Sequence, residues 1–231
     1  MGFKNIIKPL AFTAFLSFSS VMAIANVKEY GIAILPEQAC SRKITLLNAE
    51  IASLLPHFPN SQNKWHVTLY QGVYKLEDLP IIIKVLQNIK IKPMTLTFTS
   101  IYSTADRWID FGIVKTAELD KLHYEVVGAF NKYHLGPLAR VRDIYNTLPK
   151  EKKEQVDKYG VSGVMEYYNP HLTVFYKYPA DAALQQASKK IQKLAKEGMV
   201  CRASSIAIGE LGYNGNIVNI IYKADIKNES N

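Results

Sequence analysis

Two short stretches of one pattern, WHVTLY and PHLTVFY, constrain this chain more than any other feature. In the first, His66 and Thr68 alternate with aliphatic residues, and in the second His171 and Thr173 do the same. Successive side chains of a β-strand point to opposite faces, so each stretch is predicted to place its histidine and threonine together on one face. Two imidazoles and two hydroxyls can then converge on one cleft.

The two stretches occupy equivalent places in a duplicated order of elements. Each half of the chain reads as a helix, the motif strand, a second helix and a β-hairpin. The helical patterns lie within residues 37–56, 78–89, 122–133 and 184–198, and the hairpins within 94–114 and 200–226, the second turning at Asn214-Gly215. The motif histidines are 105 residues apart, and the Asp78 and Asp181 caps of the following helices 103.

This near-constant offset is typical of a duplicated unit, although α and β segments alternate in many unrelated domains too. We therefore expect an α+β fold made of a single domain, residues 26–231, with two pseudo-symmetric lobes. The lobes are expected to correspond roughly to residues 26–115 and 116–231, each an antiparallel sheet packed with helices. The motif strands should then meet between the lobes, where ligand sites tend to form.

The first 25 residues are predicted to be a signal peptide rather than part of the fold. Lys4 and Lys8 precede an apolar run that closes on small residues at Ala23 and Ala25. An uncleaved membrane anchor is the alternative, but the run is shorter than the roughly 20 apolar residues that span a bilayer. We expect cleavage after Ala25 and a periplasmic or secreted protein that does not associate with the membrane.

Charge and cysteine content are less decisive. The formal net charge is +8, and it falls to +6 when the two lysines of residues 1–25 are removed. A basic surface favours phosphate-bearing partners, but solvated lysines on helix faces explain it equally well. Cys40 and Cys201 are the only cysteines. In an oxidising compartment they can form a disulfide, and two separate buried thiols are the alternative.

The halves differ by an insertion at residues 134–169, which leads directly into the second motif. A segment of this length inside a compact domain is typical of a functional element. Its PKEKKEQVDKY portion is predicted to be a short solvated helix. Arg140, Arg142 and Tyr168 are its candidate substrate-binding residues, with surface charge and ordinary packing as the alternative for each.

The motif residues suit acid–base chemistry at a phosphate. A neutral imidazole accepts a proton near pH 7 and an imidazolium donates one. Two histidines on opposite sides of a phosphorus can thus activate a water or ribose hydroxyl and protonate the leaving oxygen, while the threonines donate hydrogen bonds to the phosphate. No cofactor is required, and the strands lack the carboxylates that a metal site would favour. The other histidines, His57, His123 and His134, are interpreted as structural or surface residues.

The paired HVTL and HLTV sequences, their duplicated setting and the YNPHLT approach to the second motif resemble the two-histidine (2H) phosphoesterase superfamily. The resemblance covers essentially all of residues 26–231. It implies a bilobal α+β fold with both motifs in a central cleft, and catalytic and phosphate-binding roles for His66, His171, Thr68 and Thr173. The superfamily includes 2′-5′ RNA ligase-like proteins and cyclic phosphodiesterases, most of them intracellular, so a signal peptide is a departure from it.

Aromatic residues near the motifs are candidates for stacking a nucleobase. Strict strand alternation places Tyr70 and Phe175 on the same face as their motif histidine, and it turns Trp65 and Tyr176 toward the core. Tyr70 and Phe175 are therefore predicted to contact substrate.

These observations predict a monomeric, metal-independent phosphodiesterase. Its expected substrate is a nucleotide or short RNA with a 2′,3′-cyclic phosphate or a 2′-5′ phosphodiester bond. Two alternatives remain open at this point: a module that binds nucleotide or RNA without turnover, and a 2′-5′ RNA ligase, which would run the reverse chemistry.

Overall fold

In the part of the chain that the structure describes, seven antiparallel strands form one sheet, in agreement with the predicted α+β class. The computed structural model describes residues 26–55, 64–105, 107–176, 181–194 and 199–227. Within them the strands pair in the order β2-β1-β6-β3-β4-β5, and β7 also pairs with β6. The strands are β1 Val27–Pro36, β2 Val67–Lys75, β3 Thr95–Thr104, β4 Trp108–Ile113, β5 His171–Tyr176, β6 Val200–Leu211 and β7 Ile217–Asp225.

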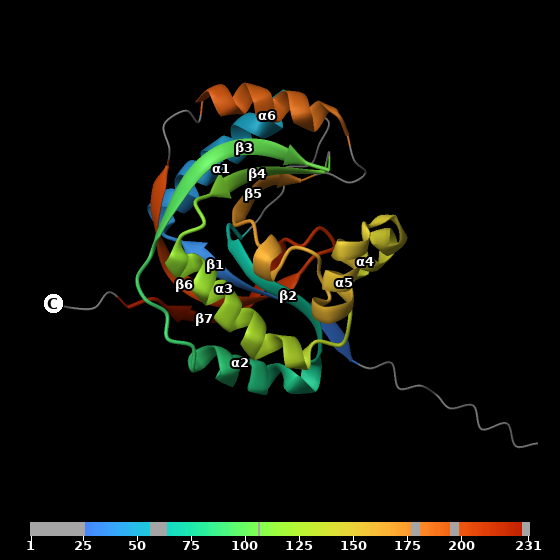
Figure 1. Ribbon diagram of the computed structural model, residues 1–231. Helices are drawn as coiled ribbons and strands as arrows, with labels where there is room; N and C mark the ends of the chain where they lie inside the picture. Colours follow the sequence, from blue (N-terminus) through green and yellow to red (C-terminus); the bar gives the residue numbers. More distant parts are fainter. Residues whose placement is uncertain (1–25, 56–63, 106, 177–180, 195–198, 228–231) are drawn as a thin grey trace, which may run out of the picture.

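Helices cover the outer faces of this sheet and one side of its opening. They are α1 Gln38–Leu54, α2 Leu79–Gln87, α3 Ala117–Phe130, α4 Ala139–Ile144, α5 Lys150–Tyr159 and α6 Ala183–Leu194. Figure 1 shows α1 and α6 over one end of the sheet, α2 and α3 over the other end, and α4 and α5 at the open side between them. Among the described residues, no helix combines the length and apolarity needed to cross a bilayer.

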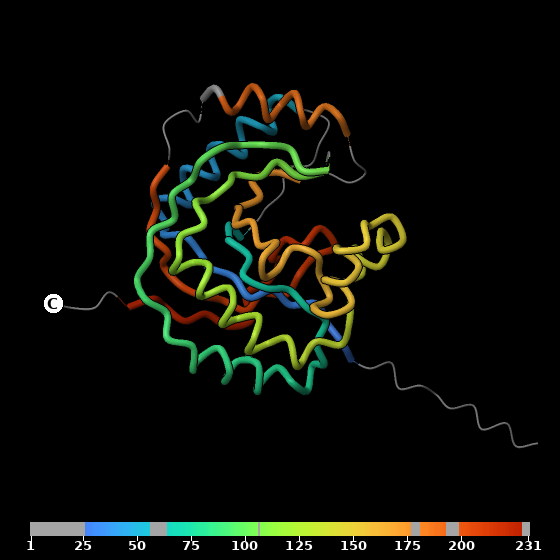
Figure 2. Tube along the Cα trace, viewed as in Figure 1, coloured from blue at the N-terminus to red at the C-terminus, as the bar shows by residue number. Residues whose placement is uncertain are grey.

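Strand β6 joins two lobes because it pairs with different neighbours along its length. Its first residues, from Val200, pair with β3, and the stretch from Ala203 to Glu210 pairs with β1. The β2 lobe comprises β1, β2, β7 and most of β6, with α2 and α3, and the β5 lobe comprises β3, β4 and β5, with α1 and α6. In Figure 2 the chain bends through this shared strand, so that β2 and β5 face each other.

We had expected each lobe to correspond to one half of the sequence, but the lobes do not follow the halves. Helix α1 of the first half packs on β5, and α3 of the second half packs on β2. The β3–β4 hairpin of the first half pairs with β5, and the β6–β7 hairpin of the second half joins the β2 lobe. The order of elements repeats as predicted, but each half contributes to both lobes. Sequence order does not determine which copy of an element packs on which motif strand.

Most local predictions agree with the structure. The apolar stripe of α1 buries Ile44 and Ile51, and PKEKKEQVDKY forms α5, which ends at Gly160 with a left-handed φ of 73°. The hairpin turn predicted at Asn214-Gly215 is present, with a φ of 81° at Gly215. Of the predicted caps, Asp181 accepts a hydrogen bond from the Ala183 amide, whereas Asp78 makes no capping bond.

Strand β1 was not predicted. It lies between β2 and β6, so both of its edges are paired, and both of its faces are covered, since Ile32 and Ala33 point to opposite faces and are equally buried. A strand covered on both faces does not show the polar–apolar alternation that identifies a surface strand. The predicted signal peptide, His57 and the helix end at Gly198 lie outside the described residues.

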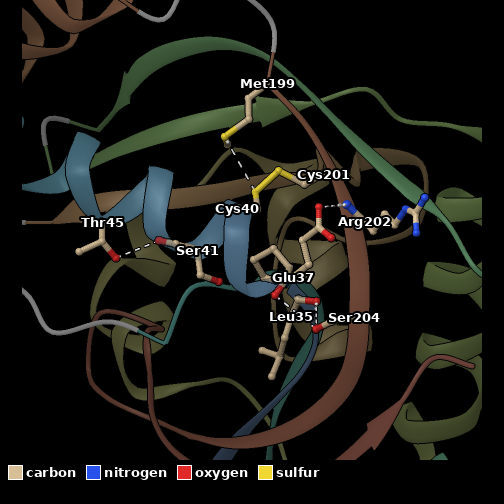
Figure 3. Close-up of a disulfide and its surroundings, with 10 residues drawn as sticks. Leu35, Glu37, Cys40, Ser41, Thr45, Met199, Cys201, Arg202 and Ser204 are labelled. Atoms are coloured by element: carbon tan, nitrogen blue, oxygen red, sulfur yellow. Dashed lines mark hydrogen bonds between the residues drawn. A yellow bond between two sulfur atoms is a disulfide. The ribbon is translucent and has the colours of Figure 1, made fainter.

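Cys40 and Cys201 form a disulfide, which decides between the two alternatives left by the sequence. Figure 3 shows how it joins the first turn of α1 to the start of β6. The two Cα atoms are 5.8 Å apart. Next to it, the Glu37 amide donates to the Arg202 carbonyl oxygen at 3.0 Å. The disulfide therefore ties a helix of the β5 lobe to the strand that both lobes share.

Replacing both cysteines by alanine is expected to lower the free energy of unfolding by about 2–4 kcal/mol, because the bond closes a long loop and restricts the unfolded chain. Urea denaturation of wild-type and double-variant proteins measures this difference. A reducing agent should destabilise the wild type and leave the variant unchanged. Equal stability of the oxidised wild type and the variant would contradict this role.

Candidate active site

A cleft of about 380 Å³ lies between the lobes, and both motifs line it. His66 and Thr68 contribute from the β2 lobe, and His171 and Thr173 from the β5 lobe. This volume is in the range of pockets that hold small organic ligands. The structure therefore brings the four motif residues together, as the sequence predicted.

The two imidazoles are held in the same way. His66 Nδ1 lies 2.6 Å from the carbonyl oxygen of Lys64, and His171 Nδ1 lies 2.8 Å from that of Asn169, in each case two residues earlier in the chain. A carbonyl oxygen only accepts hydrogen bonds, so Nδ1 must carry the proton in both rings. This leaves Nε2 of each histidine for chemistry in the cleft, as an acceptor when the ring is neutral and a donor when it is charged.

The environment favours the neutral form of His66. Burial lowers its pKa from 6.5 to about 4, the hydrogen bond to Lys64 opposes this shift, and the nearby His171 lowers the pKa further. At neutral pH the His66 imidazole is thus a proton acceptor.

The motif threonines differ in their surroundings. Thr173 Oγ1 donates a hydrogen bond to Oδ1 of Asp110, at 2.7 Å, and Asp110 is only 3% exposed. Thr68 is paired instead with Ala33, which offers no such acceptor. The hydroxyl proton of Thr173 is thus committed to a carboxylate, so the prediction that both threonines donate to one phosphate fits Thr68 better than Thr173.

Both motif strands contain a β-bulge directly after the threonine. On β2, Thr68 and Tyr70 pair with the consecutive residues Ala33 and Ile32, and Leu69 is the extra residue. On β5, Thr173 and Phe175 pair with the consecutive residues 110 and 109 of β4, and residue 174 is extra. Each bulge shifts the alternation of side chains by one position for the rest of the strand.

Phe175 does not share the face of its motif histidine, as we had predicted, whereas Tyr70 lines the cleft but is almost fully buried. Tyr70 is 1% exposed, and its hydroxyl lies 2.9 Å from the carbonyl oxygen of Tyr159. Phe175 is fully buried in the core. Gln71 and Tyr176, the residues that follow Tyr70 and Phe175, also line the cleft, and the orientation predicted for Tyr176, toward the core, was wrong.

In each bulge, the carbonyl oxygen of the extra residue accepts a hydrogen bond from a buried side chain on a helix of the other half of the chain. Asn48 on α1 donates through Nδ2 to the Val174 carbonyl oxygen, at 2.7 Å. His123 on α3 donates through Nδ1 to the Leu69 carbonyl oxygen, at 2.7 Å. Buried carbonyl groups need a partner, so these two bonds stabilise the bulges.

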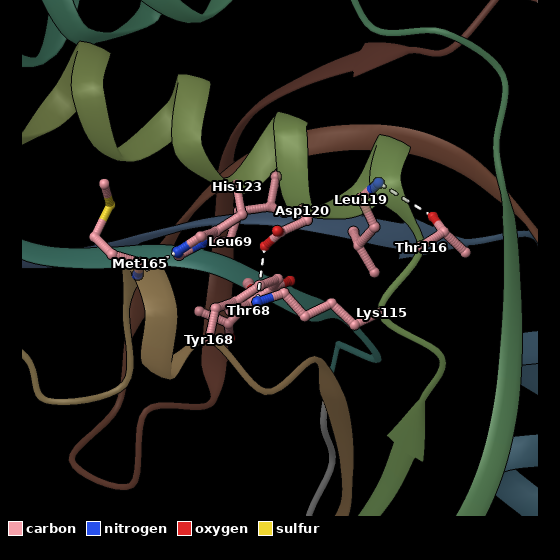
Figure 4. A network of polar contacts seen from close by, with 9 residues as sticks. All are labelled: Thr68, Leu69, Lys115, Thr116, Leu119, Asp120, His123, Met165 and Tyr168. Atoms are coloured by element: carbon pink, nitrogen blue, oxygen red, sulfur yellow. Dashed lines mark hydrogen bonds and ion pairs between the residues drawn. The ribbon is translucent and has the colours of Figure 1, made fainter.

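His123 also positions the segment before the second motif. Its Nε2 accepts a hydrogen bond from the Met165 amide at 2.8 Å, and its ring stacks on Tyr168 with centroids 3.8 Å apart. Figure 4 shows His123 on α3 between Leu69 and Met165, with Tyr168 beside Thr68. The Tyr168 hydroxyl donates to the Thr68 carbonyl oxygen at 3.1 Å. Tyr168 lines the cleft as predicted, but its hydroxyl binds the protein, and His123 is structural.

The two arginines of the insertion have different positions. Arg140 lines the cleft, and its Nη2 donates to Oε1 of Gln71 at 2.5 Å. Arg142 is exposed, donates to the carbonyl oxygen of Pro137 at 2.8 Å, and is not among the residues that line the cleft. Arg140 therefore remains a candidate for substrate binding, whereas the prediction for Arg142 is wrong because the short helix α4 turns it away from the cleft.

Solved structures share this fold. TT0787 of Thermus thermophilus aligns with a TM-score of 0.52 and 13% sequence identity, over 87% of this chain and 100% of that one. E. coli LigT, in a crystal structure with NADP+, aligns with a TM-score of 0.50 and 11% identity, over 87% of this chain and 98% of that one. No protein-family model and no curated protein sequence matches the chain.

The chain has the two-histidine phosphoesterase fold. This confirms the fold that the paired motifs indicated. Among the described residues, no three His, Cys, Asp or Glu side chains are grouped so that they could hold a metal ion.

The sequence did not predict several of the residues that line the cleft. They are Gln71, Tyr102, Trp108, Asp110, Tyr176 and the β6–β7 turn from Tyr213 to Asn216. Trp108 and Asp110 alternate on a strand that was predicted correctly, so their shared face was available as a signal. The turn contacts the cleft only because β6 bends between the lobes.

His66 is expected to remain neutral, with its proton on Nδ1, down to about pH 5. Proton–nitrogen correlation spectra of the imidazoles, recorded from pH 8 to pH 4, measure this. Because the folded pKa lies below the unfolded value, the unfolded state binds the extra proton first, and the stability contributed by His66 is complete above about pH 6.5 and declines toward pH 4. Removing the charge of His171 with His171→Asn should raise the pKa of His66, and an unchanged or lower value would contradict the coupling.

Proposed function

We propose that this protein is a metal-independent phosphodiesterase that hydrolyses a 2′,3′-cyclic phosphate or a 2′-5′ phosphodiester of a nucleotide or oligoribonucleotide. One observation carries the proposal. Two imidazoles from opposite lobes line the same cleft, and a backbone carbonyl fixes each with its proton on Nδ1. This arrangement leaves two Nε2 atoms, which is what paired proton transfers across one phosphorus require.

The surroundings of each histidine suggest a division of roles. His66 is neutral at pH 7 and therefore fits the base, which takes a proton from the attacking water. His171 then donates a proton to the leaving oxygen. Thr68 donates a hydrogen bond to a non-bridging oxygen of the phosphate, where negative charge builds up in the transition state. Thr173, held by Asp110, presents lone pairs to the cleft and can accept a hydrogen bond from a substrate hydroxyl or from the attacking water.

The comparison with E. coli LigT supports a nucleotide as the ligand, because that protein was crystallised with NADP+. The aromatic residues Tyr102, Trp108 and Tyr176 in the cleft are consistent with stacking of a base.

Replacing either motif histidine should abolish most of the hydrolysis. We expect His66→Ala and His171→Ala each to lower kcat for a nucleoside 2′,3′-cyclic phosphate by about 10²–10⁴-fold, with the folding transition retained, since a proton transfer is lost and no core residue is removed. The reaction should not respond to EDTA. His134→Asn is the matched control, because His134 lies outside the cleft and its Nδ1 only accepts from the Gly136 amide, as an Asn oxygen can. Full turnover by either alanine variant would refute the proposal.

A binding module without turnover is the main alternative, and phosphorus NMR separates the two. The mature protein is mixed with a nucleoside 2′,3′-cyclic phosphate, and the cyclic signal should be replaced by that of a monoester. A shifted cyclic signal that persists would indicate binding alone. Ligation is the reverse chemistry, and oligonucleotides with 2′,3′-cyclic and 5′-hydroxyl ends test it in the same spectrum.

We also propose that the protein is exported and works in the periplasm or outside the cell. The pattern of residues 1–25 and the Cys40–Cys201 disulfide support this, since disulfides persist in oxidising compartments. Expression of the full chain in a Gram-negative host should give a soluble periplasmic protein whose N-terminal sequence starts at Asn26. Recovery of the intact chain from the cytoplasm would contradict export.

A further inference from the structure

The two walls of the cleft differ at the position five residues after each motif histidine. The bulges turn both of these residues into the cleft. On the β2 lobe the residue is Gln71, an amide, and on the β5 lobe it is Tyr176, an aromatic residue. The two motifs are therefore equivalent around the attacked phosphate, but they differ at the residues that would contact the remainder of the substrate.

The β5 lobe presents an aromatic surface. Tyr176 is the direct cross-strand partner of Trp108, and both side chains are half-buried in the wall of the cleft. Trp108 donates its indole N–H to the carbonyl oxygen of Asn214 at 3.2 Å, which holds the ring against the β6–β7 turn. The buried carboxylate of Asp110 lies on the same face of β4, so this wall repels a second phosphate.

On the β2 side of the cleft, helix α4 places a cation against β2. Arg140 is held by Gln71, whose Nε2 in turn donates to the Gly215 carbonyl oxygen at 3.0 Å. A Cβ atom at Gly215 would lie 3.0 Å from Arg140 Nη2, so a larger residue there would crowd the guanidinium.

The charge of Arg140 is poorly compensated. Arg140 makes no ion pair with any described residue, and its buried Nη1 has no hydrogen-bond partner. Glu29 is the acidic group that acts on Arg140, but its carboxylate accepts a hydrogen bond from the Ala139 amide. An anion in the cleft would offset the cost of burying this cation.

We propose that the substrate lies across the cleft in one direction, with its nucleobase on Trp108 and Tyr176 and a second phosphate, beyond the one attacked, beside Arg140. This rests on the proposed function and narrows the substrate class to nucleotides that carry a further phosphate, such as the 5′-phosphate of a terminal nucleotide in an oligonucleotide.

The geometry of a nucleotide allows this arrangement. In a nucleoside 2′,3′-phosphate the base leaves the ribose at C1′ and the 5′ carbon leaves it at C4′, so the two groups diverge from the phosphate that lies between the histidines. Arg107, directly before β4, also lines the cleft on the aromatic side, and it is the competing cation for a second phosphate.

The test is equilibrium binding of two product-type ligands, adenosine 3′-monophosphate and adenosine 3′,5′-bisphosphate, by calorimetry at one fixed ionic strength. Neither ligand needs to be turned over. The wild type should bind the bisphosphate about tenfold more tightly, as expected for one charge-assisted contact. Arg140→Met should remove this preference, and Arg140→Lys, which keeps the charge, should retain part of it. Arg142→Met is the matched control on the same helix, with the same change in charge, and should behave as the wild type.

Tyr176→Leu tests the other wall and should weaken both ligands equally, by about tenfold. The proposal is overturned if the wild type shows no preference for the bisphosphate, if Arg140→Met keeps it, or if Arg107→Met removes it instead. A Tyr176→Leu variant that loses only bisphosphate binding would overturn the orientation. Binding of the expected kind without hydrolysis would refute the proposed function and leave this inference standing, and hydrolysis without the preference would do the opposite.

Discussion

Two buried hydrogen bonds underlie the geometry of the cleft. The Asn48 amide binds the free carbonyl of the bulge on β5, and the His123 imidazole binds that of the bulge on β2. In each case the donor comes from a helix of the opposite half of the chain. Because the bulge decides which residues after the threonine face the cleft, the walls of the site depend on helices that contribute nothing to the chemistry. Without such a partner the buried carbonyl would destabilise the bulged conformation, and a regular strand would be favoured instead.

The same bonds explain how far the sequence could predict the site. His66, Thr68, His171 and Thr173 precede the bulges, and simple alternation placed them correctly. Phe175 and Tyr176 follow a bulge, and alternation placed both on the wrong face. A bulge here depends on Asn48, more than 100 residues away in the sequence, so no local pattern could reveal it. The helices and hairpins, by contrast, follow from local apolar spacing and turn chemistry, and they were predicted well.

Strand β1 and the exchange of elements between halves were not predictable for a related reason. A repeat in the sequence establishes which elements exist and their order. It does not establish whether α1 packs on the motif strand of its own half or on the other one, because both have the same apolar faces. Arg140 was singled out as a charged residue of the insertion, but its importance comes from Gln71 and Gly215, which are brought to it by β2 and by the β6–β7 turn.

Because each half of the chain contributes elements to both lobes, neither half is expected to fold by itself. If the chain were cut in the segment between β4 and α3, near Lys115, neither fragment would hold a complete lobe, since each would lack the helix that covers its motif strand. The two fragments would have to associate in order to fold, and the disulfide between Cys40 and Cys201 would then link them covalently. In its packing, the protein thus resembles a domain-swapped dimer of two similar halves that are joined by the segment between β4 and α3.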